Sequence, residues 1–169
     1  TDKKTVDLCS GSGAIAVALD KISGAKVMAV EIDETAFSYL ETNVKENNSS
    51  VKPVMADALE ICETFADGEL DLIVSNPPYI KSADIETLQK EVRLEPRLAL
   101  DGGEDGYDFY REIVSRWSRK LKKGGALAFE LGENQADAVK ALMTDKGFSD
   151  FKISLDFGGV QRAIIGTLL

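Results

Sequence analysis

The feature that most constrains the fold is a glycine turn placed between a short strand and a helix near the start of the chain. Lys4 to Leu8 is a β-branched and apolar run that leads into Gly11-Ser12-Gly13. Ala14 to Ile22 follows, with the Ala, Leu and Val content of a helix. Glycines at the carboxyl end of a strand allow close backbone approach to a ligand at the helix N-terminus, so the segment predicts a nucleotide-like ligand there.

The same alternation of strand and helix continues along the chain, which predicts a mostly parallel sheet with helices on both faces. The last two strands are joined by Asp156 to Arg162, which leaves no room for a crossover helix, so they should form an antiparallel hairpin at the sheet edge. The further strands expected are Lys26 to Glu31, Val51 to Ala56, Leu70 to Ser75, Ala126 to Leu131, Phe151 to Leu155 and Ala163 to Leu168, and the further helices are Glu34 to Asn47, Ala58 to Phe65, Tyr107 to Leu121 and Gln135 to Lys146.

One long irregular stretch interrupts this alternation. It runs from Asn76 to Asp105, with short helical turns expected around Ile85 to Lys90. Loops of this length in a compact domain tend to be functional. The 169 residues otherwise predict a single α/β domain, Rossmann-like, with a seven-stranded sheet.

Composition excludes several kinds of chemistry. The sequence has no histidine, which excludes a Ser-His-Asp or Cys-His relay, and its two cysteines, Cys9 and Cys62, lack the spacing of a zinc site, so no metal is expected. No apolar run approaches the about 20 residues that a membrane span needs. The net charge of −9 opposes direct nucleic-acid binding. These features favour a cytoplasmic protein that acts on a protein or a small molecule.

Two acidic residues are candidates for contacts with a nucleoside. Glu31 ends the second strand about twenty residues after the glycines, where an acidic side chain can accept hydrogen bonds from ribose hydroxyls. Asp57 follows the third strand and could accept from an adenine amino group, or it could cap the helix expected at Ala58. Asp33 is interpreted as the N-cap of the second helix.

The run Asn76-Pro77-Pro78-Tyr79 directly follows an apolar strand and carries the most specific chemical signal. Two prolines fix φ and remove two backbone donors, so the loop is stiff and cannot continue the sheet. The Asn76 side-chain oxygen and the Pro77 carbonyl can accept the two hydrogens of an NH₂ group, and Tyr79 can stack on the planar group that bears it. An amide nitrogen is a poor nucleophile, and fixed acceptors can orient it towards an electrophilic methyl.

With these residues in place, the sequence resembles the class I S-adenosylmethionine-dependent methyltransferases. Within them it resembles the HemK-type protein-glutamine N5-methyltransferases, which modify peptide chain release factors. The resemblance covers essentially the whole chain and is carried by three segments: Asp7-Leu8-Cys9-Ser10-Gly11-Ser12-Gly13-Ala14-Ile15-Ala16, Asn76-Pro77-Pro78-Tyr79-Ile80, and Glu95-Pro96-Arg97-Leu98-Ala99-Leu100-Asp101-Gly102-Gly103-Glu104-Asp105-Gly106.

The resemblance implies S-adenosyl-L-methionine as cofactor, S-adenosyl-L-homocysteine as product and a release factor as partner. It implies that Cys9, Ser10, Gly11, Ser12 and Gly13 wrap the methionine part of the cofactor. By the same resemblance, Glu31 holds the ribose, the corner of Asp57 and Ala58 faces the adenine, and Asn76 borders both cofactor and substrate.

On the substrate side, the resemblance implies that Asn76, Pro77, Pro78 and Tyr79 hold the glutamine of a Gly-Gly-Gln loop at the transferable methyl. Arg97 is a candidate docking residue, although a scaffolding salt bridge explains it about as well. Members of the family carry an amino-terminal helical domain, and this chain, which opens at Thr1 almost directly on a strand, is expected to be the catalytic domain without it.

Three alternatives remain at this point. A ribosomal-protein glutamine methyltransferase or an adenine N6-methyltransferase would use a similar proline-rich motif. A nicotinamide-dependent dehydrogenase would explain the glycine turn and Glu31 but leaves Asn76 to Tyr79 without a purpose. In a non-catalytic scaffold, the intact Asn76 to Tyr79 motif would have no function. The sequence does not predict an oligomeric state.

Overall fold

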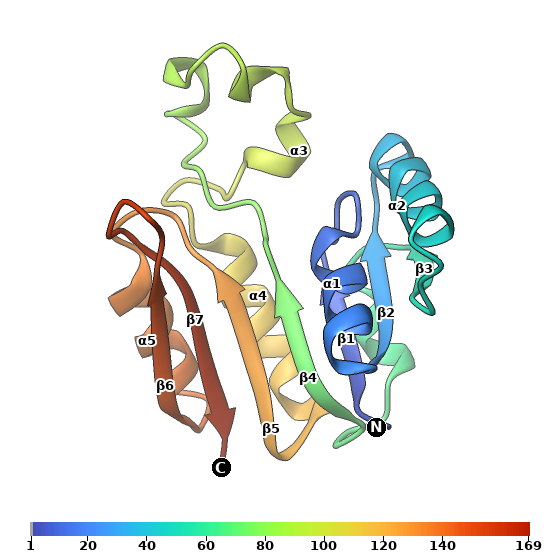
Figure 1. Cartoon of the computed structure of the whole chain (residues 1–169). Helices are drawn as coiled ribbons and strands as arrows, with labels where there is room; N and C mark the ends of the chain where they lie inside the picture. The colour runs from blue at the N-terminus through green and yellow to red at the C-terminus, as the bar shows by residue number, and fades with distance from the viewer. Residues whose placement is uncertain (1) are drawn as a thin grey trace.

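The computed structural model describes residues 2–169, so Thr1 lies outside the described residues. These residues form one seven-stranded sheet in the order β3-β2-β1-β4-β5-β7-β6 (Figure 1). The sheet pairs are parallel from β3 through β5, and β7 is antiparallel to both β5 and β6. The strands are β1 (Lys4–Leu8), β2 (Lys26–Glu31), β3 (Lys52–Met55), β4 (Leu70–Ser75), β5 (Leu121–Glu130), β6 (Phe148–Leu155) and β7 (Gln161–Leu168).

Helices cover both faces of the sheet, and the expected α/β architecture with its antiparallel hairpin is confirmed. Figure 1 shows α1 and α2 on the near face, over β1, β2 and β3, with α4 and α5 behind the sheet. The α-helices are α1 (Ala14–Ser23), α2 (Glu34–Glu46), α3 (Arg97–Leu100), α4 (Asp108–Trp117) and α5 (Ala136–Thr144), and the 3₁₀ turns are η1 (Ile61–Thr64), η2 (Ile85–Thr87), η3 (Val92–Leu94) and η4 (Ser118–Lys120).

Three segments differ from the sequence expectation. The short helix expected from Ala58 to Phe65 is reduced to the 3₁₀ turn η1, and the segment from Asn76 to Asp105 contains the extra helix α3. The helix expected to run through Leu121 ends at Trp117, and β5 begins at Leu121 instead. Pairing explains the last difference, because Leu121 is buried opposite Leu70 of β4.

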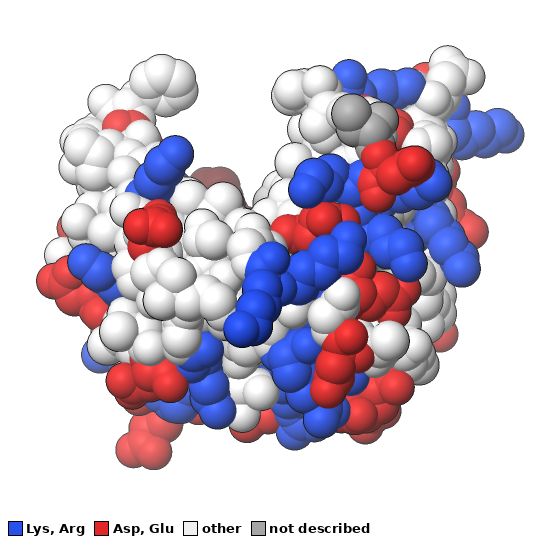
Figure 2. Space-filling view, turned by 90° about the horizontal axis from the view of Figure 1, so that it is seen from below, with Lys and Arg blue, Asp and Glu red and all other residues white. Residues whose placement is uncertain are grey.

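The start of β5 is also fixed by charge at the amino-terminal edge of the sheet. Asp71 of β4 accepts hydrogen bonds from Lys122 Nζ at 2.8 Å and from the Lys4 backbone N–H at 2.9 Å. These bonds hold the pKa of Asp71 down, at about 2. Figure 2 looks at this edge and shows basic side chains, Lys and Arg together, gathered beside acidic ones. Among residues 2–169, no helix is both long and apolar enough to cross a membrane.

The hydrophobic core has two parts, one on each side of the sheet. The smaller part lies under α1 and α2 and includes Ala16, Val27 and Leu40. Close approach of these two helices needs the glycine before α1, because Gly13 has φ of +80° and a Cβ there would overlap the Leu40 side chain. The larger part lies under α4 and α5.

Trp117 is the largest side chain of the larger core and is fully buried. Its ring packs against Phe65 with centroids 5.2 Å apart, and its Nε1–H donates to the Ala58 carbonyl at 2.9 Å. The tryptophan therefore anchors the segment after β3 to α4. That segment forms part of the cavity described below.

Replacing Trp117 by Phe should lower the unfolding free energy by about 2 to 4 kcal/mol, because the change leaves a cavity and an unpaired buried carbonyl. Urea unfolding followed by circular dichroism measures the difference. The matched control is Tyr39→Phe, at a side chain that is 60% exposed, and it should change stability by less than about 0.5 kcal/mol. Equal effects of the two changes would contradict the anchoring role.

Candidate active site

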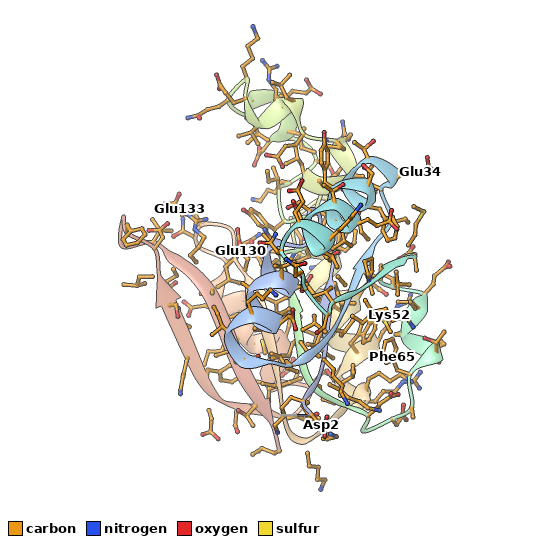
Figure 3. All side chains as sticks on the ribbon, turned by 45° about the vertical axis from the view of Figure 1, so that its right-hand side comes forward. Asp2, Glu34, Lys52, Phe65, Glu130 and Glu133 are labelled. Carbon is orange, nitrogen blue, oxygen red and sulfur yellow. The ribbon has the colours of Figure 1, made fainter. Side chains whose placement is uncertain are left out.

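The carboxyl ends of β1, β2 and β4 meet at one edge of the sheet and border a cavity of about 300 Å³. This is the edge at which open α/β sheets place their ligands. In Figure 3, Glu34 at the start of α2 and Glu130 at the end of β5 mark this edge, and Asp2 lies at the opposite one. The lining residues are Cys9, Gly11, Val30, Glu31, Ile32, Asp33, Ala36, Ala56, Asp57, Ala58, Leu59, Asn76, Pro78, Glu95, Pro96, Leu98, Ala99 and Phe109.

The glycine turn after β1 forms one side of the cavity. Cys9 and Gly11 line it, whereas Ser10, Ser12 and Gly13 are not among the lining residues and shape the turn. The turn needs left-handed backbone, with φ of +56° at Cys9 and +54° at Gly11. It is closed by the Gly13 N–H, which donates to the Ser10 carbonyl at 2.8 Å.

Glu31 lines the cavity from the end of β2 and is 8% exposed. Its Oε2 accepts the Gly11 N–H at 2.7 Å, and its Oε1 accepts the N–H groups of Ile32 and Asp33, both at 2.9 Å. A carboxylate offers about four acceptor positions, so three are used by the protein and one remains. Glu31 therefore fixes the glycine turn and keeps capacity for one hydroxyl donor.

Asp57 and Ala58 form the next corner of the cavity. Asp57 Oδ1 accepts the Leu59 N–H at 2.7 Å, and the Asp57 carbonyl accepts the Ile61 N–H at 3.0 Å. The side chain thus caps the turn that leads to η1, as one of the two sequence interpretations expected, and it also borders the cavity. The N-cap expected at Asp33 is confirmed, because its Oδ1 accepts the Ala36 N–H at 2.8 Å.

The Asn76-Pro77-Pro78-Tyr79 loop follows β4 at the same edge. Asn76 is exposed and lines the cavity with Pro78, whereas both prolines are buried and Tyr79 is half-buried. The end of β4 is fixed to β1 by Ser75, whose hydroxyl donates to the Leu8 carbonyl at 2.8 Å. Burial is the main cause that raises the Tyr79 pKa above its usual value, followed by the nearby Glu130.

The long segment between β4 and α4 forms a further wall of the cavity. Pro96, Leu98 and Ala99, in and next to α3, line it. Arg97 is not among the lining residues. Its Nε bonds Asp101 Oδ2 at 3.0 Å while the side chain stays 59% exposed, which agrees with the scaffolding interpretation and leaves docking as a proposal.

Asp7 is a buried carboxyl at the end of β1. It is fully buried, its Oδ2 accepts the Ala16 N–H at 3.0 Å, and its Oδ1 has no partner among the described residues, as is also true of the Ser10 hydroxyl. Burial raises the Asp7 pKa to about 7, with a smaller contribution from Glu31. Burial also raises the pKa of the Cys9 thiol, to about 12, so this thiol is not a nucleophile at neutral pH.

The cavity has the composition of a nucleoside site. Val30, Ile32, Leu59, Leu98 and Phe109 give it apolar walls that can enclose a planar base. Four acidic residues also line it, Glu31, Asp33, Asp57 and Glu95. No group of three or more histidine, cysteine or acidic side chains within residues 2–169 is placed to hold a metal ion.

Comparison with known proteins agrees with this geometry. The sequence profile of the family described as "Methyltransferase small domain" matches residues 1–95, which include the glycine turn, Glu31 and the Asn76 to Tyr79 loop.

The chain belongs to the methyltransferase small domain family.

Individual relatives of this methyltransferase domain are more specific. The chain is 42% identical to a release factor glutamine methyltransferase of Geobacter sulfurreducens and 37% identical to one of Clostridium acetobutylicum. Each match covers 96% of the chain, and the chain spans 57% and 58% of those two proteins. A methyltransferase structure from Pyrococcus furiosus has a TM-score of 0.75 at 24% identity, covering 98% of this chain and 75% of that one, and so shows the fold.

Sequence reasoning missed one wall of the site in this methyltransferase domain. Pro96, Leu98 and Ala99 were interpreted as part of a loop, and Phe109 as an ordinary residue of α4, yet all four line the cavity. Ile32 was also missed, between Glu31 and the cap Asp33. The only signal was the apolar character of Leu98 and Ala99, which several other residues of the loop share, such as Ile85 and Val92, and their spacing does not reveal which of them face the cavity.

Asp7→Asn tests the buried carboxyl through the pH dependence of stability without a cofactor. Because the Asp7 pKa is raised from 3.8 to about 7 in the folded state, ionisation destabilises the fold as pH rises from about 4 to 7, and the loss is complete above the folded value. The variant lacks this loss, so its stability relative to wild type should increase by up to about 4 kcal/mol between pH 4 and pH 8. Urea unfolding at several pH values measures the difference. An offset that stays constant with pH would contradict the assignment.

Proposed function

We propose that this chain is the catalytic domain of an S-adenosylmethionine-dependent methyltransferase that methylates the N5 amide of the glutamine in the Gly-Gly-Gln motif of peptide chain release factors. The observation that carries the proposal is that Asn76 and Pro78 border the same cavity as the glycine turn and Glu31. An acceptor loop for an NH₂ group and a nucleoside site thus share one space. The relatives named release factor glutamine methyltransferase support this substrate.

The cofactor contacts follow from the cavity walls. The turn from Cys9 to Gly13, which meets the cavity through Cys9 and Gly11, surrounds the methionine part. Glu31 takes a ribose hydroxyl at its remaining acceptor position, and the corner of Asp57 and Ala58 meets the adenine. When bound, S-adenosyl-L-methionine supplies an electrophilic methyl on a sulfonium and leaves as S-adenosyl-L-homocysteine. The apolar side chains of Ile32, Leu59 and Leu98 exclude water around the base.

The chemical step needs orientation more than acid or base strength. The Asn76 side-chain oxygen and the Pro77 carbonyl accept the two amide hydrogens, and Tyr79 stacks on the planar amide. Because both prolines are buried, the Pro77 carbonyl and the backbone that carries Asn76 keep their positions when the substrate arrives. The nitrogen becomes acidic as it is alkylated, so its proton can leave late to water. No strong base is required.

The rest of the molecule is consistent with a protein substrate in the cytoplasm. The net charge of −9 disfavours a nucleic-acid substrate such as adenine in RNA or DNA. Both Cys9 and Cys62 are free thiols, as expected in a reducing compartment. Arg97, exposed beside the cavity wall, is available to dock the release factor.

Asn76→Ala in the full-length protein should lower kcat for methylation of a release factor by about 100-fold or more, because one of the two fixed acceptors is removed. Binding of S-adenosylhomocysteine, measured by calorimetry, should be largely kept. The matched control is Asn47→Ala at the exposed end of α2, which should leave both quantities unchanged.

Mass spectrometry of the release factor after incubation with labelled cofactor gives the direct readout. One added methyl on the Gly-Gly-Gln glutamine supports the proposal. If the methyl is found instead on a ribosomal-protein glutamine or on adenine, the proposed substrate is wrong. Unchanged turnover of the Asn76 variant would refute the role of that residue.

A further inference from the structure

A buried glutamine connects the acceptor loop to two other segments. Gln135 lies between β5 and α5 and is 8% exposed. We infer that Gln135 is a positioning residue that fixes the Asn76 to Tyr79 loop for methyl transfer. The inference rests on the proposed function, in which the Asn76 to Tyr79 loop carries the acceptors for the substrate amide. Gln135 would hold that loop in place.

All four hydrogen-bonding positions of the Gln135 amide are used. Its Oε1 accepts the Gly132 N–H at 2.9 Å and lies 3.2 Å from the Tyr110 hydroxyl, which shares its single proton between Gln135 and the Glu130 carbonyl at 2.9 Å. Its Nε2 donates to the Tyr79 carbonyl at 3.1 Å and to the Gly106 carbonyl at 3.2 Å. A backbone N–H can only donate and a carbonyl can only accept, so the amide has one satisfactory orientation.

Three glycines bring the surrounding backbone close enough for these bonds. A Cβ at Gly132 would lie 2.6 Å from Gln135 Oε1, and one at Gly106 would lie 2.7 Å from the Tyr79 carbonyl oxygen. A Cβ at Gly102 would lie 2.7 Å from Tyr79 Cα. Tyr79 is therefore enclosed by two separate parts of the chain, residues 102–106 and the segment at Gly132, and Gln135 bonds both of them.

The acceptor loop needs such support because of its own composition. Pro77 and Pro78 have no N–H with which to bond neighbouring strands. The first backbone bonds after them are the Ile80 N–H to the Leu100 carbonyl at 2.9 Å and the Gly102 N–H to the Ile80 carbonyl at 2.8 Å. The bond from Gln135 Nε2 holds the Tyr79 carbonyl, which lies between the two prolines and the backbone bonds of Ile80.

The position of Gln135 predicts which kinetic constant it controls. Gln135 is not among the residues that line the cofactor cavity. Its bond to the Tyr79 carbonyl lies two residues from the Pro77 carbonyl, one of the two proposed acceptors. A shift of the loop would therefore misplace the amide nitrogen and affect the cofactor less, because only Asn76 and Pro78 of the loop line the cavity and its other walls come from other segments. Misplacement by about 1 Å can lower a rate by about 100-fold.

Two variants of the full-length protein separate positioning from stability. Gln135→Glu keeps the oxygen that faces Gly132 and Tyr110 but loses the two N–H donors to Tyr79 and Gly106. Gln135→Met keeps a similar volume and loses all four bonds. We expect kcat to fall by about 10- to 100-fold in both, with the KM for S-adenosylmethionine within about threefold of wild type. The control is Gln161→Glu, an exposed residue at the start of β7, which should leave both constants unchanged.

Amide hydrogen exchange provides a readout that does not depend on the substrate. Loss of the Gln135 bonds should speed exchange of the Ile80 and Gly102 amides and leave the amides of β1 and β2 at wild-type rates. Exchange that rises equally across the sheet, or kcat that stays within about twofold of wild type in both variants, would overturn the inference.

The two proposals can fail separately. If wild-type protein does not methylate release factor glutamine while exchange at Ile80 and Gly102 rises in the variants, the proposed function fails and Gln135 still holds the loop. If wild-type protein is active and neither exchange nor kcat responds to the variants, the role of Gln135 fails and the proposed function stands.

Discussion

The pairing of β1 with β4 is the constraint on which the rest of the site depends. The sheet order reverses at this pair, since the chain runs outward from β1 to β3 and then returns to add β4 on the other side of β1. The two connections that leave these strands diverge to opposite faces, which opens a crevice between them. Register then matters, because Leu8 lies opposite Ser75 and both loops begin at the same level. The bond from Ser75 to the Leu8 carbonyl closes this pair at the crevice.

Glu31 extends this constraint to the third strand of the site. A single carboxylate accepts N–H groups from the turn after β1 and from the turn after β2. Backbone donors at two loops are thereby satisfied by one buried group. These bonds hold the glycine turn in its left-handed conformation at Cys9 and Gly11, which reduces the ordering that ligand binding requires.

The fold and the centre of the site could be predicted from sequence because their signals are local. The run from Lys4 to Gly13, the acidic end of β2 and the prolines after β4 each combine a regular element with residues that end it. The walls built by α3 could not be predicted, because the position of Leu98 depends on a bridge between Ile80 and Asp101. Gln135 was likewise placed in a helix by its pattern, and three of its four partners, Tyr79, Gly106 and Tyr110, are distant in the sequence. Long-range contacts of this kind leave no periodicity in the sequence.

The bridge between Ile80 and Asp101 makes the position of the rest of the domain insensitive to the length of the segment between them. Residues 81–100 leave and re-enter the domain at neighbouring points, so the ends of the segment are fixed whatever its length. The free energy of closing such a loop changes slowly with the number of residues in it. Insertions, deletions or exchanges within residues 81–94 can therefore alter the outer surface while Asn76 and the cofactor cavity stay in place. The outer surface of this segment and the wall that it gives to the cavity are thus formed by different stretches of one continuous piece of chain.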